Sequence, residues 1–205
     1  MKSKTSGIAV VTVGLAALLA APAFAAEIVG SPRADRLEGT AGRDSVDALA
    51  GADSVWTYRN DDFAQGKQGR DRLHLGVGND RACGGAGDDR MVGGPGNDRL
   101  VGGICPRGFD WDGFDVVFGG KGRDYLEGTR QYGGDGADSH IVGGSRPVKI
   151  LAGRGNDLIY NQFGKPGGRR DVLRCGPGRD TVEYAFKRDK ADVRVSCEEI
   201  IVWID

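Results

Sequence analysis

The most informative chemical feature of the sequence is a row of aspartates spaced nine residues apart. Eight of them keep this spacing without a slip: Asp35, Asp44, Asp53, Asp62, Asp71, Asp80, Asp89 and Asp98. Such regularity indicates a repeated structural unit. If two units form one coil of a solenoid, the carboxylates stack in two columns with neighbours about 4.8 Å apart. Like charges at that distance repel, so the pattern predicts a cation between them.

The nine-residue unit itself predicts a tight turn followed by a very short strand. Residues 84–92 and 93–101 both read Gly-Gly-x-Gly-x-Asp-x-apolar-x. Glycine at the first, second and fourth positions permits positive φ and close backbone approach, which a tight turn requires. An apolar residue follows each aspartate two positions later: Leu37, Val46, Val55, Ala64, Leu73, Ala82, Met91 and Leu100. Strands this short bury such side chains only by stacking coil on coil.

These tandem units resemble the haemolysin-type calcium-binding repeat, also called the RTX nonapeptide. The pattern recurs at residues 119–126, 153–159 and 175–182, with partial copies around Asp115, Asp138 and Asp171. One copy would be weak evidence, whereas a tandem array is specific. The resemblance implies an all-β fold, a right-handed parallel β-roll. It also implies calcium held between the aspartates of neighbouring turns and backbone carbonyl oxygens of both turns.

Calcium is the cation that this residue set favours. It takes about six to eight oxygen ligands, backbone carbonyls included, whereas magnesium needs a smaller octahedral shell and zinc and copper prefer His or Cys. We interpret the two histidines, His74 and His140, as structural or solvated. The expected calcium ligands are Asp44, Asp53, Asp71, Asp80, Asp89, Asp98, Asp115, Asp124, Asp138, Asp157 and Asp180, with the turn glycines Gly78, Gly87, Gly96, Gly122, Gly155 and Gly178.

The glycine content of the turns ranks these sites. The pairs Asp71 with Asp89 and Asp80 with Asp98 are expected to be the best formed, because their turns keep most of the glycines. The turns at Asp35 and Asp62 have few glycines and are expected to be empty.

Arginines beside the aspartates depart from the family pattern and allow two interpretations. Arginine precedes the aspartate at Arg43, Arg70, Arg123 and Arg179 and follows it at Arg36, Arg72, Arg81, Arg90 and Arg99. Guanidinium groups could bridge carboxylates along a column and replace some calcium ions. Alternatively, they form a solvated face.

The amino terminus predicts an exported protein. Lys2 and Lys4 precede an apolar run from Ile8 to Ala21, and residues 23–25 read Ala-Phe-Ala, so residues 1–25 are expected to be a secretory signal peptide. The whole chain has a formal net charge of −1, and loss of the two lysines makes it −3. No basic footprint for nucleic acid, no polybasic membrane patch and no membrane span is expected.

Four cysteines in an exported chain indicate disulfides, and three pairings are possible. The spacing favours Cys83 with Cys105 and Cys175 with Cys197, because each pair is 22 residues apart, a little more than one 18-residue coil. The alternative is free, buried thiols.

The chain after the leader is expected to be one repeat domain, residues 26–182, followed by a strand-forming cap, residues 183–205. Residues 104–112, 129–132 and 162–166 break the period and are expected to bulge as loops. Residues 143–151 keep the repeat length but place Val148 where the aspartate belongs.

The sequence contains no sign of a catalytic domain. No His-Glu-x-x-His or Gly-x-Ser-x-Gly motif occurs. We therefore expect a calcium-binding β-roll with a structural or surface-interaction role. A first alternative is a module that binds surface polysaccharide through the inserted loops. A second is a polysaccharide lyase or hydrolase that uses Asp110 and Asp112 of the aromatic loop 109–114.

Overall fold

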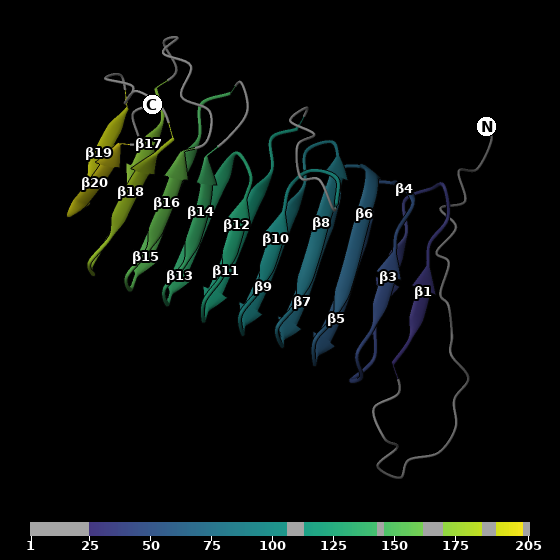
Figure 1. Cartoon of the computed structure of the whole chain (residues 1–205). Coiled ribbons are helices and arrows are strands. Elements are labelled where there is room, and N and C mark those ends of the chain that lie inside the picture. The colour runs from purple at the N-terminus through teal and green to yellow at the C-terminus, as the bar shows by residue number, and fades with distance from the viewer. Residues whose placement is uncertain (1–24, 106–112, 143–145, 162–169, 186–191, 203–205) are drawn as a thin grey trace, which may run out of the picture.

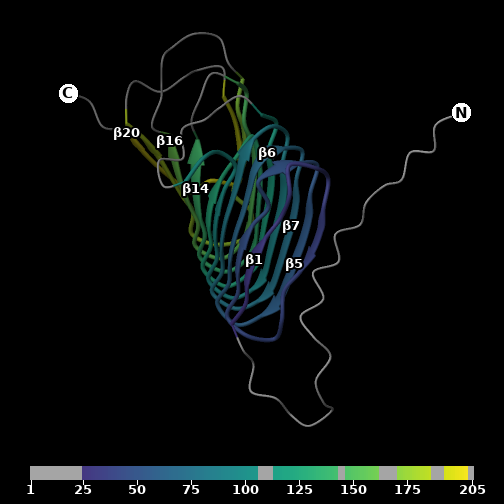
Figure 2. The same cartoon turned by 90° about the vertical axis from the view of Figure 1, so that its right-hand side faces the viewer.

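The chain winds into a parallel β-solenoid. The computed structural model describes residues 25–105, 113–142, 146–161, 170–185 and 192–202, and every regular element in these ranges is a β-strand. Successive strands alternate between two sheets, and each strand pairs in parallel with the equivalent strand of the next coil. Figure 1 shows the coils side by side along one axis, and Figure 2 looks along that axis onto the two sheets. The predicted all-β roll is confirmed.

Sheet A contains β1 (Glu27–Val29), β3 (Ser45–Asp47), β6 (Phe63–Gly69), β8 (Arg81–Ala86), β10 (Arg99–Val101), β12 (Tyr125–Glu127), β14 (Ser139–Val142), β16 (Leu158–Asn161), β18 (Thr181–Tyr184) and β20 (Glu199–Val202), with β4 (Ala50–Gly51) also paired to β6. Sheet B contains β2 (Arg36–Glu38), β5 (Ser54–Arg59), β7 (Arg72–Val77), β9 (Arg90–Pro95), β11 (Val116–Lys121), β13 (Arg130–Asp135), β15 (Lys149–Arg154), β17 (Val172–Arg174) and β19 (Val193–Val195).

The two edges of the roll differ in how strictly they keep the period. The lower edge, at the bottom of Figure 1, holds the turns that lead from sheet B to sheet A, and the upper edge holds the turns back. Equivalent residues are 18 apart in the first coils and then 26, 14, 19, 23 and 21 apart. The strand bounds place these changes at the upper edge, which leaves the lower edge regular up to β18.

One of the expected loops is wrong. Residues 129–132 were expected to bulge, but β13 begins at Arg130 and pairs in register with both β11 and β15. The upper turn is missing here, so that Gly128 and Thr129 join β12 directly to β13 and the coil shrinks to 14 residues. The nine-residue period breaks here because this coil has 14 residues, fewer than the 18 of the first coils. The other two expected loops fall largely outside the described residues.

The interior is a narrow apolar core with one polar layer. The eight apolar residues that follow the aspartates of the regular array are all at most 2% exposed, as predicted. Two apolar clusters occupy the interior, one from Ile28 to Leu126 and one from Val148 to Val202. Between them, Nδ1 of His140 lies 3.1 Å from Oε1 of Gln131, and both side chains are fully buried. Gln131 also donates to the carbonyl oxygens of Gly128 and Ile141.

Candidate calcium-binding edges

The aspartates form two columns along the edges of the roll, and the upper one is interrupted at Thr129 and Val148, which carry no carboxylate. In each column the backbone N–H of one aspartate donates to Oδ1 of the aspartate in the next coil, as in Asp71 to Asp89 (2.9 Å) and Asp80 to Asp98 (2.9 Å). The lower column is Asp44, Asp62, Asp80, Asp98, Asp124, Asp138, Asp157, Asp180 and Glu198. The upper column is Asp35, Asp53, Asp71, Asp89, Asp115, Thr129, Val148, Asp171 and Asp192.

The second carboxylate oxygen of most column members is buried and has no hydrogen-bond partner. This holds for Oδ2 of Asp53, Asp62, Asp71, Asp80, Asp89, Asp98, Asp124, Asp138, Asp157 and Asp180. A buried carboxylate oxygen without a partner is costly, because it has lost its hydration and gained nothing in exchange. Ten repetitions of the same orphaned atom indicate a missing positive partner.

Backbone carbonyl oxygens lie beside these orphaned oxygens. A Cβ added to Gly84, the first residue of its turn, would meet both Oδ2 of Asp89 and the carbonyl oxygen of Gly102 in the next coil, the latter at 2.5 Å. A Cβ on Gly119 would likewise meet Oδ2 of Asp124 and the carbonyl oxygen of Gly133, the latter at 2.7 Å. The absence of a side chain at Gly84 and Gly119 thus brings a carboxylate oxygen and a carbonyl oxygen of the next coil close to the same point.

The same crowding marks the first glycine of other turns. A Cβ on Gly66 would meet Oδ2 of Asp71 and the carbonyl oxygen of Gly84, and one on Gly133 would meet Oδ2 of Asp138 and the carbonyl oxygen of Ala152. Other turns carry a side chain at this position, namely Ala48, Thr57, Leu75, Ala152 and Cys175. Sequence reasoning missed this role of the first turn residue, although its signal is the first glycine of the repeat.

Burial makes the column carboxyls hard to ionise. Desolvation, assisted by the neighbouring aspartates of the column, raises the pKa of Asp89 and Asp98 from 3.8 to about 7. Desolvation also raises the pKa of Asp62, Asp71, Asp80, Asp124, Asp138 and Asp157 to about 6. Hydrogen bonds from backbone N–H groups oppose these shifts without cancelling them. Near neutral pH a bound proton or metal cation would therefore relieve the cost of these buried charges.

The donor set fits a hard cation. Carboxylate and carbonyl oxygens are the ligands that calcium prefers, and glycine-rich turns offer several carbonyls without steric conflict. Within the described ranges no group of three or more His, Cys, Asp or Glu side chains gathers around one point. A metal here would consequently take much of its ligand shell from the backbone, as the resemblance implied.

The structure places the expected ligands unevenly. All of the expected aspartates belong to the columns, but Asp44 already accepts hydrogen bonds from the backbone N–H and the hydroxyl of Thr40. Asp35 accepts one from Ser31, in keeping with the expected empty site there. Asp62, expected to be empty as well, keeps an orphaned Oδ2.

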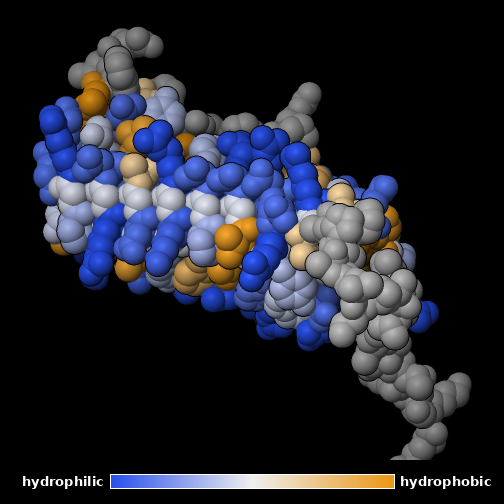
Figure 3. Space-filling model, turned by 90° about the horizontal axis from the view of Figure 1, so that it is seen from below, coloured by the Kyte–Doolittle hydropathy of each residue, from blue (hydrophilic) through white to orange (hydrophobic). Residues whose placement is uncertain are grey.

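The expected turn glycines stack along the edges. A Cβ on Gly87, Gly96, Gly122, Gly155 or Gly178 would collide with a carbonyl oxygen of the preceding coil, and all five have positive φ. These glycines therefore allow the coils to approach closely. Figure 3, seen from below, shows the lower edge as a straight pale row bordered by hydrophilic side chains.

The arginines lie away from the columns. Arg36, Arg72, Arg81, Arg90 and Arg99 begin strands and are exposed, and Arg43, Arg70, Arg123 and Arg179 lie exposed on the turns. The ion pairs found among the described residues include none between an arginine and a column aspartate. The interpretation in which guanidinium groups replace calcium therefore has no support here, and the solvated-face interpretation fits.

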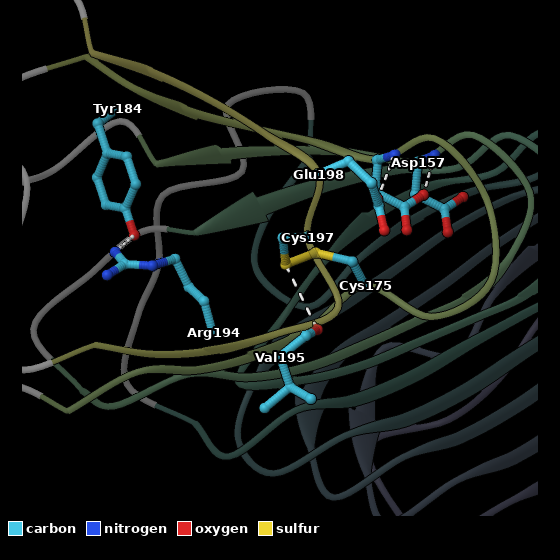
Figure 4. The surroundings of a disulfide bond; sticks show 8 residues. Asp157, Cys175, Tyr184, Arg194, Val195, Cys197 and Glu198 are labelled. Atoms are coloured by element: carbon cyan, nitrogen blue, oxygen red, sulfur yellow. Dashed lines mark hydrogen bonds between the residues drawn. A yellow bond between two sulfur atoms is a disulfide. The ribbon is translucent and has the colours of Figure 1, made fainter.

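Two disulfides join neighbouring coils, and both predicted pairings are confirmed. Cys83 bonds to Cys105, and Cys175 bonds to Cys197. Figure 4 shows the second bond beside Glu198, which accepts the N–H of Asp180 and ends the lower column. In the same coil, the Tyr184 hydroxyl donates to Asp192 and accepts from Arg194. The segment expected to be a cap thus contains the last coil of the roll.

The fold is a β-solenoid, and its two edges carry stacked, buried aspartates whose carboxylate oxygens largely lack hydrogen-bond partners. The family model of the RTX calcium-binding nonapeptide repeat matches residues 29–64, 57–91, 84–104, 112–131 and 132–164. These ranges cover more than half of the chain, so the protein belongs to this family of calcium-binding repeat proteins. No curated protein matches the chain significantly. The described part of the chain contains no helix long and apolar enough to cross a membrane.

Proposed function

We propose that this protein is an exported calcium-binding β-roll with a structural or surface-interaction role and no catalytic activity. The ten orphaned Oδ2 atoms carry the proposal, since a calcium ion supplies the positive charge that each lacks. The two disulfides support export, because such bonds persist in oxidising compartments.

The turns that begin with glycine are the sites we favour. They place Asp71, Asp89, Asp98, Asp124 and Asp138 next to the open space beside the first glycine. At Asp80, the buried side chain of Leu75 occupies the first turn position. We therefore rank Asp71 with Asp89 above Asp80 with Asp98, which the glycine count alone had treated as equals.

Calorimetric titration of calcium into chelator-treated mature protein tests the proposal. We expect several ions to bind with release of heat, and millimolar magnesium to compete poorly, because magnesium sheds its water reluctantly for a flexible carbonyl cage. A flat trace at millimolar calcium would overturn the proposal.

A second candidate function is binding of a partner molecule next to Ile104 and Cys105, where the expected loop 104–112 begins. A groove of about 570 Å³ lies there, lined by residues that include Gln65, Lys67, Cys83 and Ile104. Ile104 is 49% exposed at its rim. The variant Ile104→Asp should abolish retention on a partner that uses this groove and leave calcium binding unchanged. Asp110 and Asp112, the residues of the enzyme alternative, lie outside the described residues.

A further inference from the structure

The outer face of sheet B carries a row of cations. The first and third residues of each strand point outward, and in β2 to β17 these positions hold Arg36, Arg72, Arg90, Arg130, Lys149 and Arg174, all exposed. Glu38 is the one acidic residue at these outward positions, and it pairs with Arg36 at 2.7 Å. The protein is slightly acidic overall, with a formal net charge of −1, but many of its aspartates lie in the columns at the edges. Its broad sheet B face is basic.

Like charges sit directly opposite each other on this face. Arg72 is the register partner of Arg90, and Arg130 is the register partner of Lys149. Among the described residues none of these four side chains forms an ion pair. Like charges directly opposite each other on neighbouring strands destabilise a sheet. A negatively charged partner that spans several coils would remove this cost.

Aromatic side chains lie beside two of these cations, Arg36 and Arg90. The Arg90 guanidinium lies 4.2 Å from the ring centroid of Phe118, and Phe118 stacks on Tyr132 at 4.5 Å. Nearer the amino terminus, Trp56 stacks on His74 at 5.7 Å. The rings thus face each other along the roll axis. Fixed guanidinium groups suit bidentate contacts with carboxylates.

The shape and side chains of the sheet B face favour a carboxylated polysaccharide over nucleic acids. Single-stranded nucleic acids need open ring faces on which bases stack. Phe118 offers none, because Arg90 covers one face of its ring and Tyr132 the other. Duplex DNA is read by an element that enters a groove, whereas the sheet is flat (Figure 1). A linear carboxylated polysaccharide needs neither feature.

Coils spaced about 4.8 Å apart are separated by roughly the length of one sugar. A linear polyuronate along the roll can therefore bring carboxylates to Arg72 and Arg90 on the adjacent strands β7 and β9, and to Arg130 and Lys149 on β13 and β15. Between the two pairs it passes β11, whose outward residues Val116 and Phe118 carry no charge.

We propose that the outer face of sheet B, from Arg72 to Lys149, binds a linear polyuronate. The carboxylates of the glycan neutralise the paired cations across coils. The proposal extends the surface-interaction role above and places it on a sheet face, away from the inserted loops and the calcium edges.

Binding of short oligogalacturonates, measured at fixed calcium concentration, tests the proposal. The methyl-esterified oligomer has the same backbone without charge and should not bind. The double variant Arg72→Gln/Arg90→Gln should bind about tenfold more weakly, since each exposed charge contact contributes modestly. The matched control is Arg81→Gln/Arg99→Gln on sheet A, which also removes two register partners of like charge, one of them stacked on an aromatic ring, Tyr125.

The control and Ile104→Asp should each change the affinity by less than about twofold, as expected for residues outside the contact. Equal losses in the two double variants, or equal binding of the ester, would overturn the proposal. Tighter binding to a single-stranded oligonucleotide or to phosphatidylserine vesicles would overturn it as well. Calcium titration of each variant separates this outcome from failure of the calcium sites, because the substitutions leave every column aspartate intact.

Discussion

The backbone N–H of Asp71 donates a 2.9 Å hydrogen bond to Oδ1 of Asp89, one coil further along, while Oδ2 of the same Asp89 side chain has no partner. The two oxygens of such a carboxylate therefore have different surroundings. One oxygen holds the coil stack together through a backbone hydrogen bond. In ten of the aspartates the other oxygen is buried without a partner, and there we propose that a cation binds. These two roles lead to separate predictions for stability and for calcium binding.

Substitution of Asp89 by Asn should separate the two roles. The amide keeps an oxygen for the N–H of Asp71 but removes the charge, so about one calcium site should be lost. Without calcium the variant should be more stable than the wild type at pH 7.5, by about 1 kcal/mol, because a buried anion is replaced by a neutral donor. Thermal unfolding with and without calcium measures both effects. A calcium-free variant less stable than the wild type would contradict this account.

Substitution of Gly84 by Ala tests the space beside Oδ2. Gly84 is not at positive φ, so its own backbone conformation suits alanine, but the methyl group would meet Oδ2 of Asp89 and the carbonyl oxygen of Gly102, and one of these groups must move away. We expect the loss of about one calcium ion in the calorimetric stoichiometry. The reciprocal variant Ala152→Gly should lose none and bind at least as tightly. Unchanged stoichiometry in Gly84→Ala would show that the first turn position does not control occupancy.

The raised pKa values predict how stability depends on pH. The folded pKa of Asp89 and Asp98 is about 7, above the ordinary value of 3.8. The chelator-treated roll should therefore be most stable below about pH 4 and lose stability as the pH rises to about 7, because the unfolded chain releases these protons more readily. The stabilisation by calcium should grow over the same range. Melting curves from pH 4 to 8 test this, and a calcium-free maximum near pH 7 would refute it.

The terminal disulfide should protect the last coil. Cys175 and Cys197 close a 22-residue separation, and such loops typically stabilise a fold by about 3 kcal/mol. Replacing both by serine should raise hydrogen exchange in β19 and β20 far more than in β5 to β9. The serine pair at Cys83 and Cys105 is the control, and should leave exchange in β19 and β20 unchanged. Uniform acceleration across the roll in the terminal variant would contradict local protection.

The nine-residue spacing predicted the features that depend on period alone. It predicted the two columns, the buried residues two positions after each aspartate, and the pairing of Cys83 with Cys105 and Cys175 with Cys197, since each follows from stacking equal coils. It also identified Val148, whose N–H donates to Asp171, as a column position without a carboxylate.

The sequence did not predict the features that arise where the chain departs from the nine-residue period. Residues 129–132 interrupt the pattern in the same way whether residues are inserted or deleted, and only the register of β13 shows the deletion. Glu198 ends the lower column without any repeat glycine before it. The carbonyls beside Oδ2 come from the first turn residue of the next coil, a relationship that requires the coil stacking to be known.

The most direct test of the central claim is a crystal structure of the mature protein grown in calcium, with anomalous scattering recorded to locate the ions. We predict calcium within each column, between the turns of neighbouring coils, with Oδ2 of Asp89 and the carbonyl oxygen of Gly102 both within about 2.3 to 2.6 Å of one ion. The same density should recur beside Asp71 and Asp124. Columns that contain no anomalous peak, with Oδ2 of Asp89 bound to water or to a protein donor, would contradict the account.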